Sequence, residues 1–520
     1  FRAADPSPTF FPNGFQPELN SDVVDQALTL GVKGTIAEWT WDLSNTYGRN
    51  SLDYQVDNTV NASLLGASPT SIYAGKHAFS QNTAQLDVTR FFDDALAGIN
   101  VAFGGAYRVD HYQIFAGEEA SYRNYGRATV IDNSGPEPEL VTRDTLGKQG
   151  GAQGFVGFRP ENEVDRTRSN VAAYADTEIN LTENILVTTA GRFENYSDFG
   201  STLTGKLAAR WSLFEEQLNL RGSVSNGFRA PSLHQLHFND VKTDFDDQGR
   251  LTEIGTFSND SEVARVLGVP QLDEEQSRSA SVGLTASPTD NFDLTIDGYR
   301  IRVDDRIVLS GEFSGGNIQG LLEEVGASGA KFFSNAVDTE TLGLDVVTTY
   351  RFQTEYGNVE LSAAGNYNET EADDELNIPP TLRNNFDEDE ADFSLEDTFF
   401  SPKERALLET SSPRTKLNLS ADYGLGPVSL FLRTVRFGEV TRNEFPFGSE
   451  QVHDPQWVLD ATVSYRLTDV ATMSVGANNL FDNLPDEQIF PNSFVGVFDY
   501  APVQQGFNGA FYFARLNVQL

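Results

Sequence analysis

The chain reads WVLDATVSYRL from Trp457 to Leu467, and apolar residues occupy every second position of this stretch. Successive side chains of a β-strand point to opposite faces, so the pattern predicts a strand with one apolar and one polar face. The same alternation recurs at Leu203–Trp211, Leu218–Ser225 and Lys416–Tyr423. The sequence therefore predicts an all-β protein.

Alternation alone is compatible with a soluble β-sandwich and with an antiparallel transmembrane β-barrel. Two features favour the barrel. Tight turns such as Ser287–Asp290, Tyr423–Pro427 and Leu467–Val470 alternate with long polar loops, as expected when short turns gather on one rim and long loops on the other. Aromatic residues such as Trp211 and Trp457 also lie near strand ends, which suits interfacial girdles.

We predict about seventeen strands, from near Asp22–Lys33 to Phe507–Leu520. In the expected register, Leu459 and Val463 face lipid, whereas Lys206, Arg210 and Arg221 face the lumen. A helical turn is expected near Gln319–Val325. The long loops are expected at roughly 61–79, 109–167, 229–275, 309–334, 372–412, 441–454 and 484–506.

Composition excludes several classes of function. The 520 residues carry 37 Lys+Arg against 76 Asp+Glu, a net charge of −39, which argues against a nucleic-acid-binding surface. The absence of cysteine excludes disulfides, thiolate metal sites and thiol nucleophiles. No window approaches about 18 consecutive apolar residues, so no transmembrane helix is expected. The first residues, Phe1–Asn20, do not read as a signal peptide.

No hydrolase elbow, P-loop or metalloprotease helix occurs, so we expect no enzyme and no catalytic residues. Charged residues on the predicted lumen face could be imagined as acid–base pairs, but ion-paired walls are what such a barrel needs to solvate its interior. These residues are Asp176, Glu178, Glu194, Arg192, Arg210 and Arg221.

A second candidate is His234-Gln-Leu-His237, just after a predicted strand. On a helical turn, His234 and His237 share a face and could bind a transition metal with a carboxylate such as Asp240. The alternative is two solvated loop histidines. An acidic run follows, with Asp244, Asp246 and Asp247 among its members.

The acidic run partly matches a calcium-binding EF-hand loop that starts at Asp244, but position twelve is Gly255 rather than the bidentate glutamate. A second acidic stretch spans 373–397. Calcium bridging and a solvated acidic surface both remain open. We expect loops 229–275 and 372–412 to overhang the lumen and contribute ligand contacts, with stacking surfaces and carboxylates at Phe238, Asp240, Asp244, Phe245, Asp246, Asp247, Phe386 and Phe393.

Several motifs resemble those of the TonB-dependent outer-membrane receptors. The strongest match is Asn226-Gly-Phe-Arg-Ala-Pro-Ser-Leu233, which includes Gly227, Phe228, Arg229, Ala230, Pro231 and Ser232. Glycine permits an unusual backbone at the strand end, and proline, which lacks an N–H, stops the ladder. Their alternative role is strand termination alone. Further matches are Phe11–Glu18, Ser68–Thr70, Phe193–Lys206, Val337–Asp345 and Asn478–Asn483.

The resemblance implies a 22-stranded barrel with an N-terminal plug, set in the bacterial outer membrane. The whole of 1–520 would then be the receptor barrel domain, with about five first strands and the plug missing. The first strand is expected to run downward from the extracellular side, leaving an open edge.

The resemblance further implies energised uptake of a scarce nutrient, most commonly a ferric siderophore, with oligosaccharides, cobalamin or peptides as other cargoes. Its partners would be the TonB–ExbB–ExbD complex, reached through the missing N-terminal part, outer-membrane lipid and lipopolysaccharide, a small extracellular ligand and a surface lipoprotein. No cofactor is implied. The alternative from another class is a passive porin or surface-binding barrel.

Overall fold

The structure is a computed structural model that describes residues 10–132, 139–148, 150–245, 251–314, 318–325, 327–385, 394–444, 448–493 and 498–519. Its main feature is one sheet of 17 strands, and each strand pairs in antiparallel fashion with the next strand of that sheet along the chain. The strands are β1 (Glu18–Ile36), β2 (Trp39–Asp57), β3 (Ser71–Phe92), β4 (Ile99–Phe115), β7 (Val164–Thr182), β8 (Ile185–Tyr196), β9 (Gly200–Leu213), β10 (Leu218–Arg229), β13 (Glu275–Thr289), β14 (Phe292–Leu309), β17 (Phe333–Gln353), β18 (Asn358–Ala372), β19 (Thr415–Leu425), β20 (Val428–Phe437), β23 (Gln456–Thr468), β24 (Ala471–Asn478) and β25 (Phe511–Val518).

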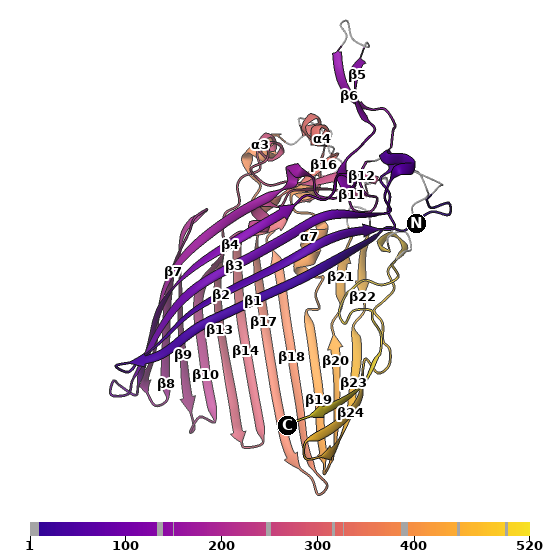
Figure 1. Cartoon of the computed structure of the whole chain (residues 1–520). Helices are drawn as coiled ribbons and strands as arrows, with labels where there is room; N and C mark the ends of the chain where they lie inside the picture. Colours follow the sequence, from indigo (N-terminus) through magenta and orange to yellow (C-terminus); the bar gives the residue numbers. More distant parts are fainter. Residues whose placement is uncertain are drawn as a thin grey trace.

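The sheet is tilted and curls around a central space (Figure 1). β1 starts at the rim with the long connections and descends, as expected from the sequence. Among the pairings of the described residues, β1 pairs only with β2 and β25 only with β24, so these two strands are the edges of the sheet. The predicted strand count and the predicted strands at Leu218–Ser225 and Trp457–Leu467 are confirmed.

Connections at one rim are tight turns, such as those between β13 and β14 and between β19 and β20. Connections at the other rim are mostly long, and this is the extracellular side in outer-membrane barrels. The long connections carry their own elements: η1 (Ala62–Ala67), α1 (Glu119–Tyr122), β5 (Arg127–Asp132), β6 (Glu139–Asp144), η2 (Pro160–Asn162), α2 (Leu233–His237), β11 (Asp240–Phe245), β12 (Leu251–Thr256), α3 (Glu262–Leu267), β15 (Phe313–Ser314), α4 (Gln319–Val325), β16 (Gly329–Lys331), α5 (Pro380–Asn385), α6 (Leu395–Phe399), α7 (Pro402–Glu409), β21 (Val440–Asn443), β22 (Glu450–His453) and η4 (Phe490–Asn492).

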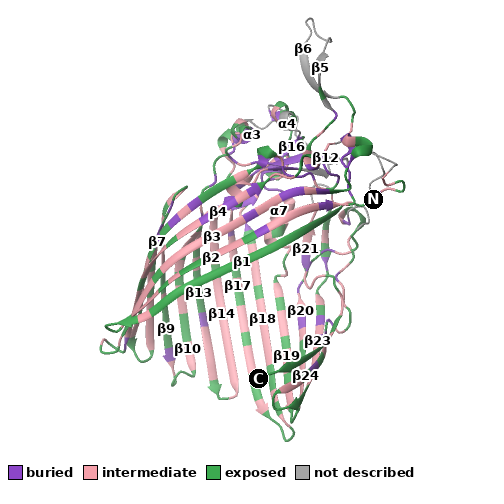
Figure 2. Ribbon diagram, in the orientation of Figure 1, coloured by how far each residue is buried: buried purple, intermediate pink, exposed green. Residues whose placement is uncertain are grey.

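The described residues of three extracellular connections, 230–274, 310–332 and 373–414, fold into a common unit that we call the loop cap. β11, β12, β16 and β15 form a four-stranded sheet within it. Its apolar core includes Phe257, Leu322, Phe332 and Leu395, together with Val337 from the upper part of β17. Figure 2 shows the buried residues gathered at this end, whereas the tilted strands below are mostly intermediate or exposed. The loop cap is therefore anchored to the upper strand ends.

Two expectations about the loops need correction. The sequence placed long loops at 61–79 and 109–167, but β3 already begins at Ser71 and β4 continues to Phe115. The upper parts of these strands still pair, but their apolar residues Ile72, Ala74, Tyr112 and Ile114 are buried against the extracellular connections instead of alternating toward lipid, so the two-residue pattern did not mark them as strand. The connection between β8 and β9 is also short at the extracellular rim. The helical turn expected at Gln319–Val325 is confirmed as α4.

Candidate functional site

The two faces of the sheet differ as the sequence predicts. Arg221 lies directly opposite Arg210 in the register, and Lys206 lies opposite Ser225, so these side chains share one face. The Nε of Arg221 donates to Oδ1 of Asp297 at 2.9 Å on the same face. The other face exposes large apolar side chains, including Leu203, Leu207, Trp211, Val224, Val282 and Val463. The apolar face is the lipid-facing exterior, and the polar face lines the lumen.

The predicted motif at Gly227–Ser232 closes β10 and ties it to its neighbours. Arg229 lies opposite Glu275 in the register and forms two hydrogen bonds with its carboxylate, at 2.5 and 2.6 Å. Glu275 is buried, and one of its oxygens also accepts from the backbone N–H of Ile307 at 2.8 Å. A Cβ at Gly227 would lie 2.8 Å from Oγ of Ser277, so a larger residue there would displace the Ser277 side chain. The pair therefore fastens the upper ends of β10, β13 and β14 together.

Arg229→Ala will lower the free energy of unfolding by about 1–3 kcal/mol, because it leaves a buried carboxylate with fewer partners. The lower part of this range is expected, since the Arg229 side chain is 55% exposed. Denaturant unfolding in lipid vesicles measures the effect. Adding Glu275→Gln should recover part of the loss, and strictly additive effects of the two substitutions would contradict a coupled pair.

Beyond β10 the chain turns inward at Pro231. The Nη1 of Arg168 donates to the carbonyl oxygen of Pro231 at 2.7 Å, and the same guanidinium lies 3.4 Å from Asp110. Ser232 then caps α2, because its Oγ accepts from the N–H of Gln235 while the Gln235 side chain accepts from the N–H of Ser232. The motif thus holds the first residues of connection 230–274 against the lumen wall.

Several predicted site residues pack against an aromatic cluster on the upper wall. The ring of Phe238 stacks on His77 with centroids 5.7 Å apart, and His234 lies 4.2 Å from the ring of Tyr112. Leu233 is buried against Tyr112 and Phe158 in the same cluster. These contacts hold α2 and the chain after it at the inner face of β3 and β4.

The two predicted metal ligands face different surroundings. His234 lies against Tyr112, whereas the charged groups around His237 are Arg166, Arg168, Asp198 and Asp260. Partial loss of hydration lowers the pKa of both imidazoles, so both are neutral near pH 7. Within the described ranges, no group of three or more His, Asp or Glu side chains is arranged to hold a metal ion.

The predicted acidic ligands are only partly described. Asp240 is buried at the start of β11, close enough to Tyr54 and Tyr112 to influence both electrostatically. Asp244 belongs to β11, within the loop cap. Asp246, Asp247, Phe386 and Phe393 lie outside the described residues, so their role as ligand contacts stays a prediction.

The lumen wall from β4 to β10 is locally basic, although the whole chain carries a net charge of −39. Register places twelve charged side chains of these five strands on the lumen face. Eight are cations, namely Arg108, Arg166, Arg168, Arg192, Lys206, Arg210, Arg221 and Arg229, and four are carboxylates, namely Asp110, Asp176, Glu178 and Glu194. A pocket of about 490 Å³ in this wall is lined by Asp176, Arg192 and Lys206 among others.

Sequence reasoning missed two residues that position the site. Arg168 is buried and contacts Pro231, yet it lies more than sixty positions away in the chain. Glu275 begins the strand after the long loop and appeared only as a loop boundary. The available signal was alternation, which places Arg168 and Arg229 on the polar face but does not name their partners.

Comparison with known proteins adds a family and a fold. The family described as "TonB dependent receptor-like, beta-barrel" matches residues 2–480. The siderophore receptor PirA from Acinetobacter baumannii matches with a TM-score of 0.60 at 14% identity, over 96% of this chain and 62% of that chain. The pyoverdine outer-membrane receptor FpvA from Pseudomonas aeruginosa PAO1 matches with a TM-score of 0.59 at 12% identity, over 96% and 62%. No curated protein sequence matches significantly.

The copper transporter OprC also matches, with a TM-score of 0.56 at 13% identity, over 97% of this chain and 65% of that chain. The chain thus spans less than two thirds of the length of these structures. At such identities the likeness shows the fold. Within the described ranges, no helix is both long and apolar enough to cross a membrane. The family match covers nearly the whole chain, and the chain therefore belongs to the TonB-dependent receptor β-barrel family of the bacterial outer membrane.

Proposed function

We propose that this barrel imports an anionic metal chelate, of which ferric siderophores are the leading class, in a TonB-dependent manner. The observation that supports this most is the basic lumen wall of β4 to β10 within a strongly acidic chain. An excess of one sign of charge on part of a lumen wall attracts solutes of the opposite sign to that part. Siderophores bind iron through oxygen donors such as catecholates, hydroxamates and carboxylates, and many of the resulting complexes are anionic.

The solved structures with this fold support the same class of cargo. PirA is described as a siderophore receptor, FpvA as a receptor bound to pyoverdine and OprC as a copper transporter. We propose that the present chain shares cargo of this kind. Copper alone is a weaker candidate, since a cation gains nothing from the basic wall.

Closure of the barrel belongs to the same proposal. In hydrocarbon, unpaired backbone N–H and C=O groups each cost several kcal/mol, so open edges at β1 and β25 need partners. We propose that further strands pair with these edges in the membrane, and that a plug in the lumen engages TonB and its ExbB–ExbD complex.

The Lys206→Glu and Arg210→Glu double variant will lower saturable uptake of an anionic ferric siderophore by about tenfold or more, because it reverses two charges on the wall. Uptake of radiolabelled iron by producing cells measures this. The matched control is the charge-conserving exchange of Lys206→Arg with Arg210→Lys, which should retain uptake. Equal uptake by the reversed and the charge-conserving variants would contradict the role of the wall.

A further inference from the structure

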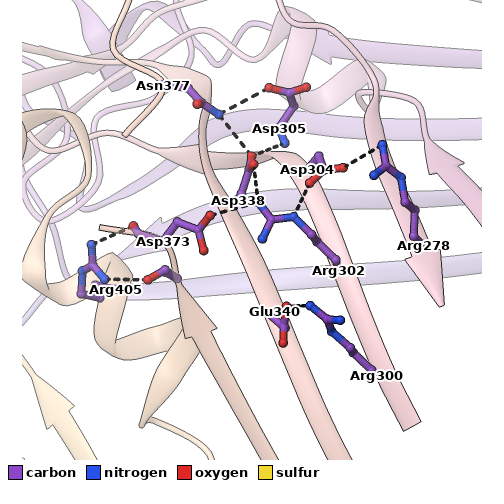
Figure 3. A network of polar contacts seen from close by, with 11 residues as sticks. Arg278, Arg300, Arg302, Asp304, Asp305, Asp338, Glu340, Asp373, Asn377 and Arg405 are labelled. Atoms are coloured by element: carbon purple, nitrogen blue, oxygen red, sulfur yellow. Dashed lines mark hydrogen bonds and ion pairs between the residues drawn. The ribbon is translucent and has the colours of Figure 1, made fainter. Parts of the chain in front are cut away.

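Three arginines lie on the exterior of the barrel rather than in its lumen. Arg278 alternates with Ala280 and Val282 on β13, and Val282 is 68% exposed on the lipid-facing side. The register places Arg302 opposite Arg278, and Arg300 opposite Ala280, so all three share this outward face. Figure 3 shows the three arginines beside the carboxylates of a polar network.

The arginines lie at the upper border of the apolar band. On β17 the apolar part of the outward face extends from Leu342 to Phe352. At roughly 3.4 Å per residue and a strand tilt of about 40°, these residues span about 26 Å in height. This agrees with the apolar band of about 25 Å in outer-membrane barrels. Arg300 lies opposite Leu342, the uppermost apolar residue, and Arg302 lies one step above. The guanidinium groups are therefore level with the lipid head groups of the outer leaflet.

A groove descends from these arginines into the apolar band. Two adjoining depressions of about 670 and 700 Å³ share Leu207, Val224, Ala280 and Arg300 in their lining. Arg278 and Arg302 line the upper one, and the small residues Ala209, Gly222 and Gly298 line the lower one. The surface thus combines a cationic upper end with an apolar slot below it.

Strand packing does not require glycine in this groove. A Cβ at Gly222 would lie 3.5 Å from the carbonyl oxygen of Ser281, and one at Gly298 would lie 3.9 Å from that of Gly343. Both are ordinary contact distances, and neither glycine has a positive φ. A larger side chain fits the backbone at both positions and would fill the slot.

The charged side chains at the top of the groove form two layers, with arginines nearer the bilayer and carboxylates at or above them. Arg302 bonds to Asp304, Asp338 and Asp373, all of which lie on its loop side (Figure 3). The side chains of Arg278 and Arg300 are 74% and 62% exposed. Arg278 lies 3.8 Å from Asp304, and Arg300 bonds to Glu340 at 2.5 Å, so each guanidinium keeps further N–H donors. The layer nearest the bilayer is cationic, and the carboxylates lie at or above it.

We propose that this groove is a binding site for lipopolysaccharide, with Arg278 and Arg300 holding a phosphate of its lipid A and the slot over Gly222 and Gly298 holding an acyl chain. Arginine forms charge-assisted, often bidentate hydrogen bonds with phosphate. The outer leaflet of the bacterial outer membrane consists mainly of lipopolysaccharide, whose acylated, phosphorylated sugar matches both parts of the site. The carboxylates above the arginines disfavour a second phosphate at that height.

The test is lipid retention by the protein purified from outer membranes in mild detergent, with lipid A and phospholipid quantified by mass spectrometry. We expect Arg278→Ala with Arg300→Ala to lower retained lipid A by about tenfold or more. Gly222→Leu with Gly298→Leu should lower it comparably without any change in charge. The matched control is Arg436→Ala, which removes an outward arginine opposite Trp457 on β20 that lines neither depression.

Folding of each variant is verified by its heat-dependent gel mobility before lipid is measured. Equal lipid A in the wild type, both double variants and the control would overturn the proposal. Retention of phosphatidylglycerol in place of lipid A, lost in the same variants, would also overturn it and assign the groove to a phospholipid. The arginine and glycine pairs act through different chemistry, so failure of one variant to fold still leaves a decisive comparison.

Discussion

Val282→Arg will destabilise the folded barrel by about 1–3 kcal/mol, because an arginine on the lipid face costs about 2–4 kcal/mol at mid-membrane and less toward the interface, and Val282 lies in the upper half of the apolar band. Val282 is 68% exposed and lies between Gly222 and Gly298 in the register, on the outward face below Arg278. Its side chain therefore meets the hydrocarbon rather than water. Unfolding by guanidinium in lipid vesicles, followed by tryptophan fluorescence, measures the loss.

The matched control is Ser281→Arg, one residue earlier on the same strand. Ser281 faces the lumen, where its hydroxyl bonds to that of Ser223 at 2.8 Å, so an arginine there stays hydrated. We expect a cost below about 1 kcal/mol, mainly from the lost hydrogen bond. Equal costs at the two positions would contradict the assigned faces, and a larger cost at Ser281 would show that they are reversed.

Phe332→Ala will destabilise the loop cap by about 3–5 kcal/mol, since a fully buried phenylalanine leaves both lost contacts and a cavity. Phe332 has no exposed surface, and its ring lies 6.2 Å from that of Phe257 and 6.1 Å from that of Phe313. Phe257 belongs to connection 230–274, whereas Phe313 and Phe332 belong to connection 310–332. The substitution therefore removes contacts that join the two connections. Hydrogen exchange should rise at 254–267 and 318–325.

Exchange in the middle of β17 should stay slow in the same variant, because the strand ladder there does not depend on the loop cap. The control is Phe490→Ala, which removes a phenylalanine that is 68% exposed in another connection. It should leave exchange in both regions unchanged. Uniformly faster exchange along the barrel after Phe332→Ala would contradict an independently packed loop cap.

Much of the barrel could be predicted because each strand and each tight turn is determined by residues that are neighbours in the sequence. Alternation within Trp457–Leu467 or Leu218–Ser225 follows from the two faces of a strand, and turns such as Tyr423–Pro427 mark where strands reverse. The predicted loop boundaries were less accurate, since the loop predicted at 61–79 ends where β3 begins at Ser71. Above the bilayer the lipid no longer demands an apolar face, so the pattern fades while the ladder continues.

The site was harder to predict, since its contacts join residues far apart in the chain. Nothing near Pro231 indicates that Arg168 binds its carbonyl, and nothing near Phe238 indicates that it stacks on His77. The local excess of cations on the lumen wall also emerges only from the register, because the total charge has the opposite sign. Likewise, Arg278 and Arg300 separate from the lumen arginines only when the faces are known.

Energised uptake of an anionic chelate is tested most directly by transport into cells that lack this receptor and are supplied with the gene again. Radiolabelled ferric siderophores of differing charge are offered one at a time, with and without collapse of the proton-motive force. We predict saturable uptake of at least one anionic ferric siderophore that stops when the proton-motive force is collapsed. Uptake that rises linearly with concentration, does not depend on the charge of the siderophore and continues after collapse of the proton-motive force would contradict energised import and indicate a passive pore.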